Sequence, residues 1–252
     1  MRKATVFFRF YEELNDFLPL ERKKSEFSHH VRIPVSIKDV IESLGVPHSE
    51  IDLILVNGVS VDFSYLVQPG DRISVYPVFE SIDISSVTHL RPRPLRQTRF
   101  VLDVHLGKLA RYLRLLGFDT RYDTQYDDAA IIELALRENR IILTRDVGLL
   151  KNKTVTHGYW VRETRPENQV MEVLRRFDLR PSCQPFTRCL ECNGSIVPAE
   201  LSQEEVNMTV PARVREMQDH YFRCDQCKRV YWQGTHYEKL KKFIAKMLDL
   251  NF

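Results

Sequence analysis

Four cysteines in two closely spaced pairs have the clearest chemistry in this sequence. Each pair has the spacing Cys-x-x-Cys, and 31 residues separate the pairs. Zn²⁺ prefers four soft ligands in a tetrahedron, and a Cys-x-x-Cys turn supplies two thiolates from one tight loop. Four protein ligands leave no open position for water, so the pattern predicts a structural zinc ribbon. The predicted ligands are Cys189, Cys192, Cys224 and Cys227.

Two disulfides and a redox-active Cys-x-x-Cys are the alternative interpretations of these pairs. The N-terminal MRKATVFFRF lacks the apolar run of a signal peptide, and a cytosolic chain keeps its thiols reduced. No apolar run approaches the roughly 18 to 20 residues that cross a bilayer. We therefore expect a soluble, cytoplasmic protein without a membrane partner. The fifth cysteine, Cys183, lies outside both pairs, and we expect it to be a spare thiol.

Acidic residues at the ends of predicted strands form a second candidate site. Asp103 and Asp146 each follow an apolar strand, and Asp127 and Asp128 stand at a helix start. Ligands of open parallel sheets bind at the carboxyl ends of the strands, so we expect these acids to converge. Crowded carboxylates need a cation, and Mg²⁺ or Mn²⁺ there can activate water for cleavage of a phosphodiester. The alternative for Asp127 or Asp128 is a helix N-cap without a catalytic role.

Basic residues are concentrated in the middle of the chain, although the net charge is only +3. Residues 81–180 carry 18 Lys and Arg against 13 Asp and Glu, whereas residues 1–80 carry 9 against 12. A basic stretch around Asp103 suits a polyanionic substrate held beside a metal-binding acid. The alternative is a solvated linker followed by an ordinary helix surface.

The elements of the first 80 residues predict a small α+β domain. ATVFFRF alternates apolar and polar residues like a half-buried strand, and Ser36 begins a capping-box pattern before a helix. Asn57-Gly58 between two strand-like runs is a strong hairpin signal, and RISVYPVF follows as a last strand. We expect a β-grasp fold.

The segment VNGVSVDFSYLVQPGDRISVYPVFE resembles the C-terminal half of the ubiquitin-like sulfur-carrier proteins of molybdopterin and thiamine biosynthesis. Those carriers act through a free C-terminal Gly-Gly, whereas this segment ends in Val78-Phe79-Glu80 and runs on into another domain. The resemblance therefore implies a ubiquitin-like domain that binds a protein partner or acts as a scaffold, rather than a sulfur carrier.

The rest of the chain predicts an α/β domain followed by the ribbon. From Arg99 onward, strands alternate with helices of about a dozen residues, which predicts a parallel sheet flanked by helices. The last residues predict an amphipathic helix that packs on this domain through Leu240, Phe243, Ile244, Met247 and Leu248. The expected divisions are a β-grasp domain at 1–80, a linker at 81–98, a nuclease domain at 99–180, and a zinc ribbon with a C-terminal helix at 181–252.

Three motifs resemble one family. D-x-HLGKLAR-x-LR-x-LGFDT, TRD-x-GLL and the cysteine motif ending in YW-x-G-x-H are similar to the PIN-like RNase domain named from the C-terminal region of the Mut-seven exonuclease, with its zinc ribbon. A β-grasp domain precedes this module in bacterial and archaeal members of that family. The resemblance implies metal-dependent cleavage of RNA, with tRNA and rRNA as candidate substrates.

The family's acids are carried over onto Asp103, Asp128 and Asp146, which would hold Mg²⁺ or Mn²⁺. Asp127 is a less certain neighbour. PIN-type sites generally use four acids, and the fourth is open here between Asp123 and Glu133.

Phosphate-binding candidates follow from the same motifs. Lys108 and Arg111 share a helical face near Asp103 in sequence, and Arg114 lies one turn beyond. Arg145 precedes the last acid. The alternative for each is a solvated helix face.

The leading hypothesis is a metal-dependent ribonuclease whose zinc ribbon aids RNA binding. Tyr231 and Trp232 beside basic residues could stack unpaired bases or could pack the small ribbon. The alternative function is a catalytically weak or inactive RNA- or ribonucleoprotein-binding module with a β-grasp domain that docks a partner.

Overall fold

The structure is a computed structural model of a mixed α/β protein, and it describes residues 2–77 and 98–248. The chain forms two compact units: unit 1 contains residues 1–97 and 128–160, and unit 2 contains residues 98–127 and 161–252. All of the predicted linker except Thr98 lies outside the described residues. The division falls inside residues 99–180, so the domain boundaries expected from the sequence stay a prediction.

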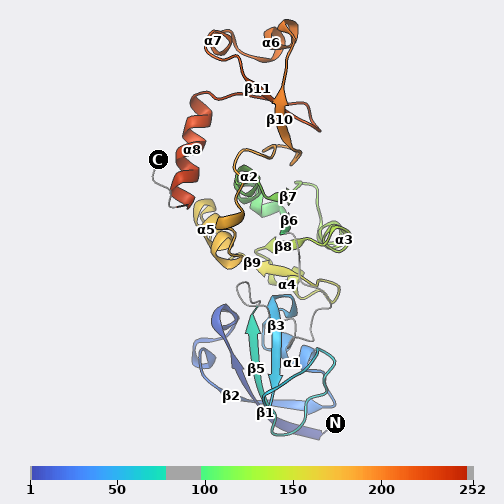
Figure 1. Ribbon diagram of the computed structural model, residues 1–252. Coiled ribbons are helices and arrows are strands. Elements are labelled where there is room, and N and C mark those ends of the chain that lie inside the picture. Colours follow the sequence, from blue (N-terminus) through green and yellow to red (C-terminus); the bar gives the residue numbers. More distant parts are fainter. Residues whose placement is uncertain (1, 78–97, 249–252) are drawn as a thin grey trace. The chain divides into compact units, whose positions relative to one another are not determined.

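A mixed five-stranded sheet in the order β2-β1-β5-β3-β4 forms the N-terminal part of unit 1 (Figure 1). β1 (Arg2–Phe10) pairs antiparallel with β2 (Phe27–Ile33) and parallel with β5 (Arg72–Pro77). β3 (Ile51–Val56) pairs antiparallel with β5 and with β4 (Val59–Ser60). With the helix α1 (Ile37–Ser43), this arrangement confirms the β-grasp fold.

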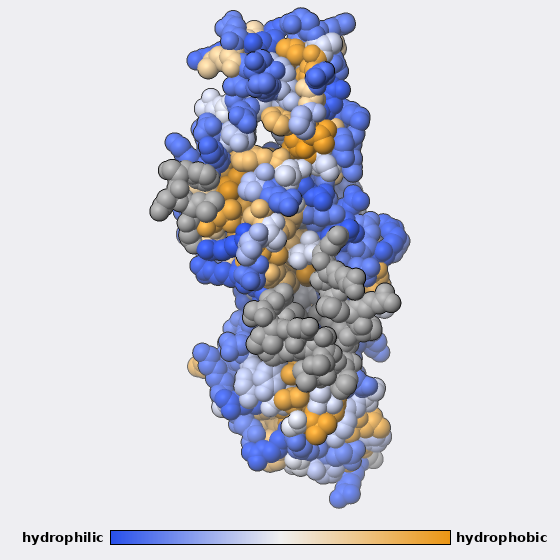
Figure 2. Space-filling view, in the orientation of Figure 1, coloured by the Kyte–Doolittle hydropathy of each residue, from blue (hydrophilic) through white to orange (hydrophobic). Residues whose placement is uncertain are grey.

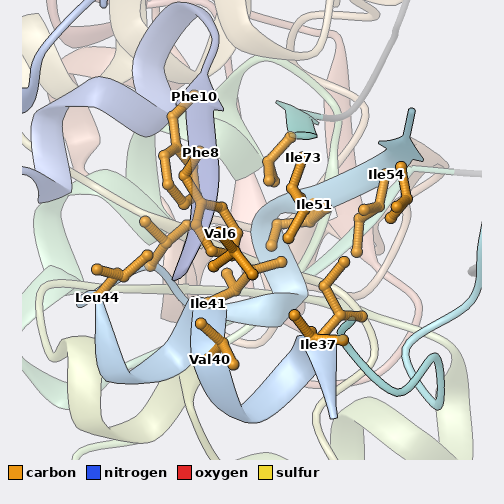
Figure 3. Packing of buried hydrophobic residues seen from close by; sticks show 14 of the residues in the cluster. Val6, Phe8, Phe10, Ile37, Val40, Ile41, Leu44, Ile51, Ile54 and Ile73 are labelled. Atoms are coloured by element: carbon orange, nitrogen blue, oxygen red, sulfur yellow. The ribbon is translucent and has the colours of Figure 1, made fainter. Parts of the chain in front are cut away.

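The apolar face of α1 packs against the alternating inward residues of this sheet (Figure 3). Side chains from β1, β3 and β5 meet the helix stripe, whose spacing of i, i+3, i+4 and i+7 places them on one side. The labelled core residues are Val6, Phe8, Phe10, Ile37, Val40, Ile41, Leu44, Ile51, Ile54 and Ile73.

Local sequence signals explain where these elements begin and turn. The Ser36 hydroxyl accepts a hydrogen bond from the Asp39 backbone N–H at 3.2 Å, which is the predicted helix cap. Asn57 and Gly58 both have positive φ, 50° and 84°, as a tight hairpin between β3 and β4 requires. Strand β2 was absent from the predicted elements, because His29 interrupts the alternation of apolar Phe27, Val31 and Ile33 with polar residues.

The remainder of unit 1 contains two helices and two strands. They are α3 (Asp128–Glu138), β8 (Ile141–Thr144), α4 (Val147–Leu150) and β9 (Gly158–Trp160). β8 and β9 pair in parallel, as the alternation of helices and strands predicts.

Unit 2 begins with the strand β6 (Arg99–Leu102), which pairs in parallel with β7 (Asp119–Arg121). The helices α2 (Gly107–Leu115) and α5 (Pro166–Arg176) belong to the same unit. The parallel pair β6–β7 in this unit and the parallel pair β8–β9 in unit 1 confirm the predicted parallel α/β architecture.

The C-terminal part of unit 2 is a small antiparallel sheet followed by a helix. β10 (Ile196–Ala199), β11 (Tyr221–Cys224) and β12 (Val230–Tyr231) form the sheet, and α6 (Gln203–Thr209) and α7 (Ala212–Arg215) lie between β10 and β11 in sequence. Short 3-10 helices occur at Glu12–Phe17, Leu20–Arg22, His48–Glu50, Val104–Leu106 and Arg180–Ser182.

The last helix, α8 (Thr235–Leu248), contacts α5. The ring of Phe243 stacks on that of Tyr112 in α2 at 4.5 Å. Packing of α8 on the helices of this domain is thus confirmed. Of the five residues expected to be buried, Ile244 and Met247 are buried. The side chains of Leu240, Phe243 and Leu248 are half-buried. No described helix is long and apolar enough to span a bilayer.

Within unit 1, the β-grasp fold is held against residues 150–160 by buried polar contacts. Ser49 donates to the Leu150 carbonyl at 3.1 Å, and His48 Nε2 lies 2.8 Å from the Val155 carbonyl. The Glu50 carboxylate, only 1% exposed, accepts the Trp160 backbone N–H at 2.5 Å. Three consecutive polar residues can be buried here because each finds a backbone partner.

We expect Glu50→Ala to lower the free energy of unfolding by about 1–3 kcal/mol, since it leaves a buried N–H without an acceptor. Denaturant unfolding of the full chain measures this. The exposed Glu21→Ala in the same fold is the matched control and should change stability by less than about 0.5 kcal/mol. Equal effects of the two variants would contradict the assigned role of Glu50.

Candidate active site and metal centre

The sulfur atoms of the four paired cysteines lie within 4.8 Å of one another. Cys189 Sγ is 3.6 Å from Cys227 Sγ, and Cys192 Sγ is 3.3 Å from Cys224 Sγ. These distances are close to the edge of about 3.8 Å of a tetrahedron with Zn–S bonds of about 2.3 Å. They greatly exceed a disulfide bond of about 2.05 Å, and all four cysteines are free thiols. The geometry therefore fits a tetrathiolate zinc site.

Two equivalent turns present the sulfur atoms. The N–H groups of Asn193 and Lys228 donate to the carbonyls of Cys189 and Cys224, at 3.0 and 3.2 Å. Asn193 and Lys228 both have left-handed φ, 70° and 62°. Gly194 follows the first turn where a Cβ would lie 2.7 Å from Cys224 Sγ, so a larger residue would displace a ligand.

Hydrogen bonds also favour the thiolate form of Cys189, which is the form that binds a metal ion. Burial alone would raise the pKa of Cys189, but N–H donors of its turn and the Tyr231 hydroxyl, 3.0 Å from Cys189 Sγ, lower this pKa to about 7. Burial raises the pKa of Tyr231, and its bond to Cys189 raises it further. Tyr231 therefore supports the ribbon. The fifth cysteine, Cys183, is outside the cluster, and burial raises its pKa to about 11.

The first cysteine turn is joined to α2 through Arg114. This side chain, 5% exposed, donates to the carbonyls of Leu190 and Glu191 at 3.1 and 2.7 Å, and to that of Thr120 at 2.9 Å. Burial lowers the pKa of Arg114, while the charges of Cys189 and Cys192 raise it. A positive charge there offsets the net negative charge of a zinc tetrathiolate.

The sequence analysis expected Arg114 to bind substrate phosphate, and we propose a positioning role for it instead. Its guanidinium is buried and committed to backbone carbonyls, which leaves it a positioning role.

Asn193 makes a second connection between the first turn and β7. Its Oδ1 accepts the Thr120 N–H at 2.9 Å, and its Nδ2 donates to Asp119 Oδ1 at 2.8 Å. Nearby, Gly117 has a φ of +95°, and a Cβ there would lie 2.2 Å from the Gln184 carbonyl oxygen. This close approach explains the glycine of the LGFDT motif.

Asp103 follows directly on β6 and is 7% exposed. Its carbonyl accepts the Leu106 N–H at 2.9 Å and so starts the turn into α2. Tyr122 lies across this turn and donates to the Val104 carbonyl at 2.9 Å. A Cβ on Gly107 would lie 2.6 Å from the Tyr122 hydroxyl, which explains the glycine of HLGK.

Asp146 follows β8 by one residue and begins α4. Its Oδ1 accepts the Gly148 N–H at 2.6 Å, and its own N–H donates to the Thr144 hydroxyl at 2.8 Å. Within the described chain, its second carboxylate oxygen has no hydrogen bond or ion pair. The preceding carbonyl, of Arg145, accepts the Trp160 indole N–H at 3.2 Å.

The remaining predicted residues are exposed. Asp128 is the first residue of α3 and belongs to unit 1 together with Asp146, whereas Asp127 is assigned to unit 2. Asp103 belongs to unit 2, so the convergence of the three carboxylates predicted to be catalytic stays a prediction. Lys108, Arg111 and Arg145 are exposed, and Arg111 pairs with Glu191 at 3.1 Å.

Comparison with models of known protein families assigns this chain to a family. The model of the Mut7-C RNAse domain matches residues 98–244, more than half of the chain. This protein belongs to the Mut7-C RNAse domain family. The Mut7-C ubiquitin model matches residues 3–83, which agrees with the β-grasp sheet. No curated protein and no solved structure matches the chain.

Sequence reasoning missed the residues that position this Mut7-C domain. Asn193, Tyr122 and Trp160 act through contacts with residues distant in sequence, and their types are common in turns and cores. The only local signal was the position of Asn193 directly after a cysteine pair, where a left-handed residue is needed.

We expect the purified protein to hold one zinc ion per chain, and Cys224→Ser to lose it, because three thiolates bind zinc less tightly than four. Metal analysis after gel filtration measures this. Cys183→Ser is the matched control and should retain the metal. Full zinc content in Cys224→Ser would contradict the assigned ligand set.

Arg114→Met should lower the free energy of unfolding by about 2–4 kcal/mol, since it leaves several buried carbonyls without donors. Chemical unfolding with zinc present measures this change. Arg111→Met on the exposed face of the same helix removes only a surface ion pair and should cost less than about 1 kcal/mol. A reversed order of the two variants would refute the positioning role of Arg114.

Proposed function

We propose that this protein is a divalent-metal-dependent ribonuclease that hydrolyses phosphodiester bonds of RNA. The observation that carries the proposal is the position of two acids in a member of an RNAse domain family. Asp103 directly follows β6 and Asp146 follows β8 by one residue, and each of these strands pairs in parallel with a neighbour. The carboxyl ends of parallel strands are where ligands bind in such sheets.

Asp103, Asp128 and Asp146 are the proposed holders of Mg²⁺ or Mn²⁺, whose oxygen-ligand chemistry these carboxylates fit. The ion supplies activation of water and stabilisation of the leaving oxygen. The exposed second oxygen of Asp146 supports this role, since its first oxygen already caps α4. Either Asp123 or Glu133, both exposed, is the proposed fourth acid.

Three exposed cations are proposed to hold RNA phosphates. Lys108 and Arg111 lie three residues apart on α2, whose first turn follows Asp103. Arg145 precedes Asp146. Structured RNAs such as tRNA and rRNA are the proposed substrates, in the cytoplasm.

Zinc is proposed as a structural ion at the four cysteines. Four sulfur ligands complete its coordination, so the ion serves folding rather than hydrolysis. The ribbon then aids RNA binding through the basic and aromatic residues next to its second turn.

A second candidate function is an RNA- or ribonucleoprotein-binding module with weak or no catalysis. The match to the Mut7-C ubiquitin domain favours it, because ubiquitin-like folds serve as docking modules for protein partners. Metal dependence separates the two functions. Binding alone weakens with salt and does not require a divalent ion, whereas hydrolysis does.

Asp146→Asn should reduce cleavage of end-labelled RNA in Mn²⁺ or Mg²⁺ by about a hundredfold or more, because the amide is a poor ligand for these ions. Asparagine caps a helix as well as aspartate, so folding should be preserved. Product lengths separate endonucleolytic from exonucleolytic cutting.

The control for lost charge is Asp178→Asn, at an exposed position whose left-handed φ of 44° asparagine tolerates. It should cleave like the unaltered protein. Full activity of Asp146→Asn would rule out the proposed site, and RNA binding without metal-dependent products in the unaltered protein would favour the second function.

A further inference from the structure

A cavity of about 580 Å³ lies in unit 2 between the ribbon, α2 and the start of α8. Its volume falls within the roughly 300–1,000 Å³ of small-ligand pockets. None of the proposed catalytic acids lines it, and Arg111 is the one proposed phosphate-binding residue that does. The face in Figure 2 shows hydrophobic and hydrophilic residues mixed over the region where Figure 1 places β10 and β11.

Aromatic rings form much of the cavity wall. Tyr237 and Phe186 contact each other with ring centroids 4.4 Å apart. Trp232 lies over Gly234, where a Cβ would come within 3.1 Å of the indole nitrogen. Among the described residues, the Trp232 indole N–H has no hydrogen-bond acceptor. The aromatic residues of the wall are Phe186, Phe222, Tyr231, Trp232 and Tyr237.

Two guanidinium groups stand beside these rings and already hold an anion. Glu191 Oε1 lies 3.1 Å from Arg111 Nη1 and 3.5 Å from Arg229 Nη1, and all three residues line the cavity. The three side chains are partly exposed, so another anion can reach the pair. A phosphate group can compete with a carboxylate for such a pair, because the arginine fork matches both groups.

We propose that this cavity binds one unpaired nucleotide of single-stranded RNA, with its base against Trp232 and its phosphate at Arg111 and Arg229 in competition with Glu191. The inference rests on the proposed function, because that function makes RNA the ligand. Aromatic faces beside a cationic edge match the two parts of a nucleotide, a flat base and an anionic phosphate. The cavity would hold a single-stranded part of the substrate on the same unit as α2.

The test is the affinity of the full-length zinc protein for labelled hexaadenylate, by fluorescence anisotropy in buffer without added Mg²⁺ or Mn²⁺. A second hexamer has the same backbone with abasic sites. We expect the abasic hexamer to bind about tenfold or more weakly, as loss of base stacking implies. Trp232→Ala should weaken hexaadenylate binding to a similar degree, and Trp232→Phe should restore most of it.

Glu191→Gln should act in the opposite direction and tighten hexaadenylate binding several-fold, since it frees the two arginines. Glu204→Gln removes the same charge from an exposed ribbon position outside the cavity and controls for net charge. Zinc content and thermal unfolding show whether each variant is folded. Equal tightening in both glutamate variants would overturn the phosphate position.

Equal affinity for the base-carrying and abasic hexamers would overturn the nucleotide pocket. Cleavage of RNA is measured separately on the same proteins. It distinguishes a failure of the nucleotide-pocket proposal from a failure of the proposed ribonuclease function. If cleavage is absent while Trp232→Ala still weakens binding, the pocket stands and the hydrolytic proposal fails. If cleavage is present and the abasic hexamer binds equally well, the reverse holds.

Discussion

The hydrogen bonds from Arg114 to the carbonyls of the first cysteine turn are the interaction on which unit 2 depends most. A buried guanidinium is tolerable only where its N–H groups are satisfied and a negative charge is near, and the cysteine turn provides both. The same turn places Asn193 against β7. Metal binding at these cysteines would therefore be energetically linked to the placement of α2.

This linkage gives the ribbon a structural role, the support of α2, in addition to its proposed role in RNA binding. The 3-10 helix Val104–Leu106 joins Asp103 to α2, which carries Lys108 and Arg111, so the ribbon supports the helix that follows the proposed catalytic acid. Arg111 also borders the aromatic cavity. One helix therefore connects a proposed phosphate-binding face, the candidate zinc site and a proposed nucleotide pocket within a single unit.

An analogous bracing operates within unit 1. The β-grasp fold binds the Trp160 backbone through Glu50, and the Trp160 indole binds the carbonyl that precedes Asp146. The ubiquitin-like domain thus has a structural function in its own chain.

The sequence alone determined the features that depend on local chemistry. Periodicity and turn residues identified the β-grasp and α/β elements, and paired cysteines identified the metal centre, because both signals lie within a few neighbouring residues. Tertiary structure decided the role of Arg114. On a helical projection Arg114 resembles Lys108 and Arg111. Only the cysteine turn, about 76 residues later in the chain, buries its guanidinium and supplies carbonyl acceptors for it. The tertiary structure likewise explains why residues 107, 117 and 194 are glycines. A Cβ atom at any of these positions would collide with a chain segment that is distant in sequence.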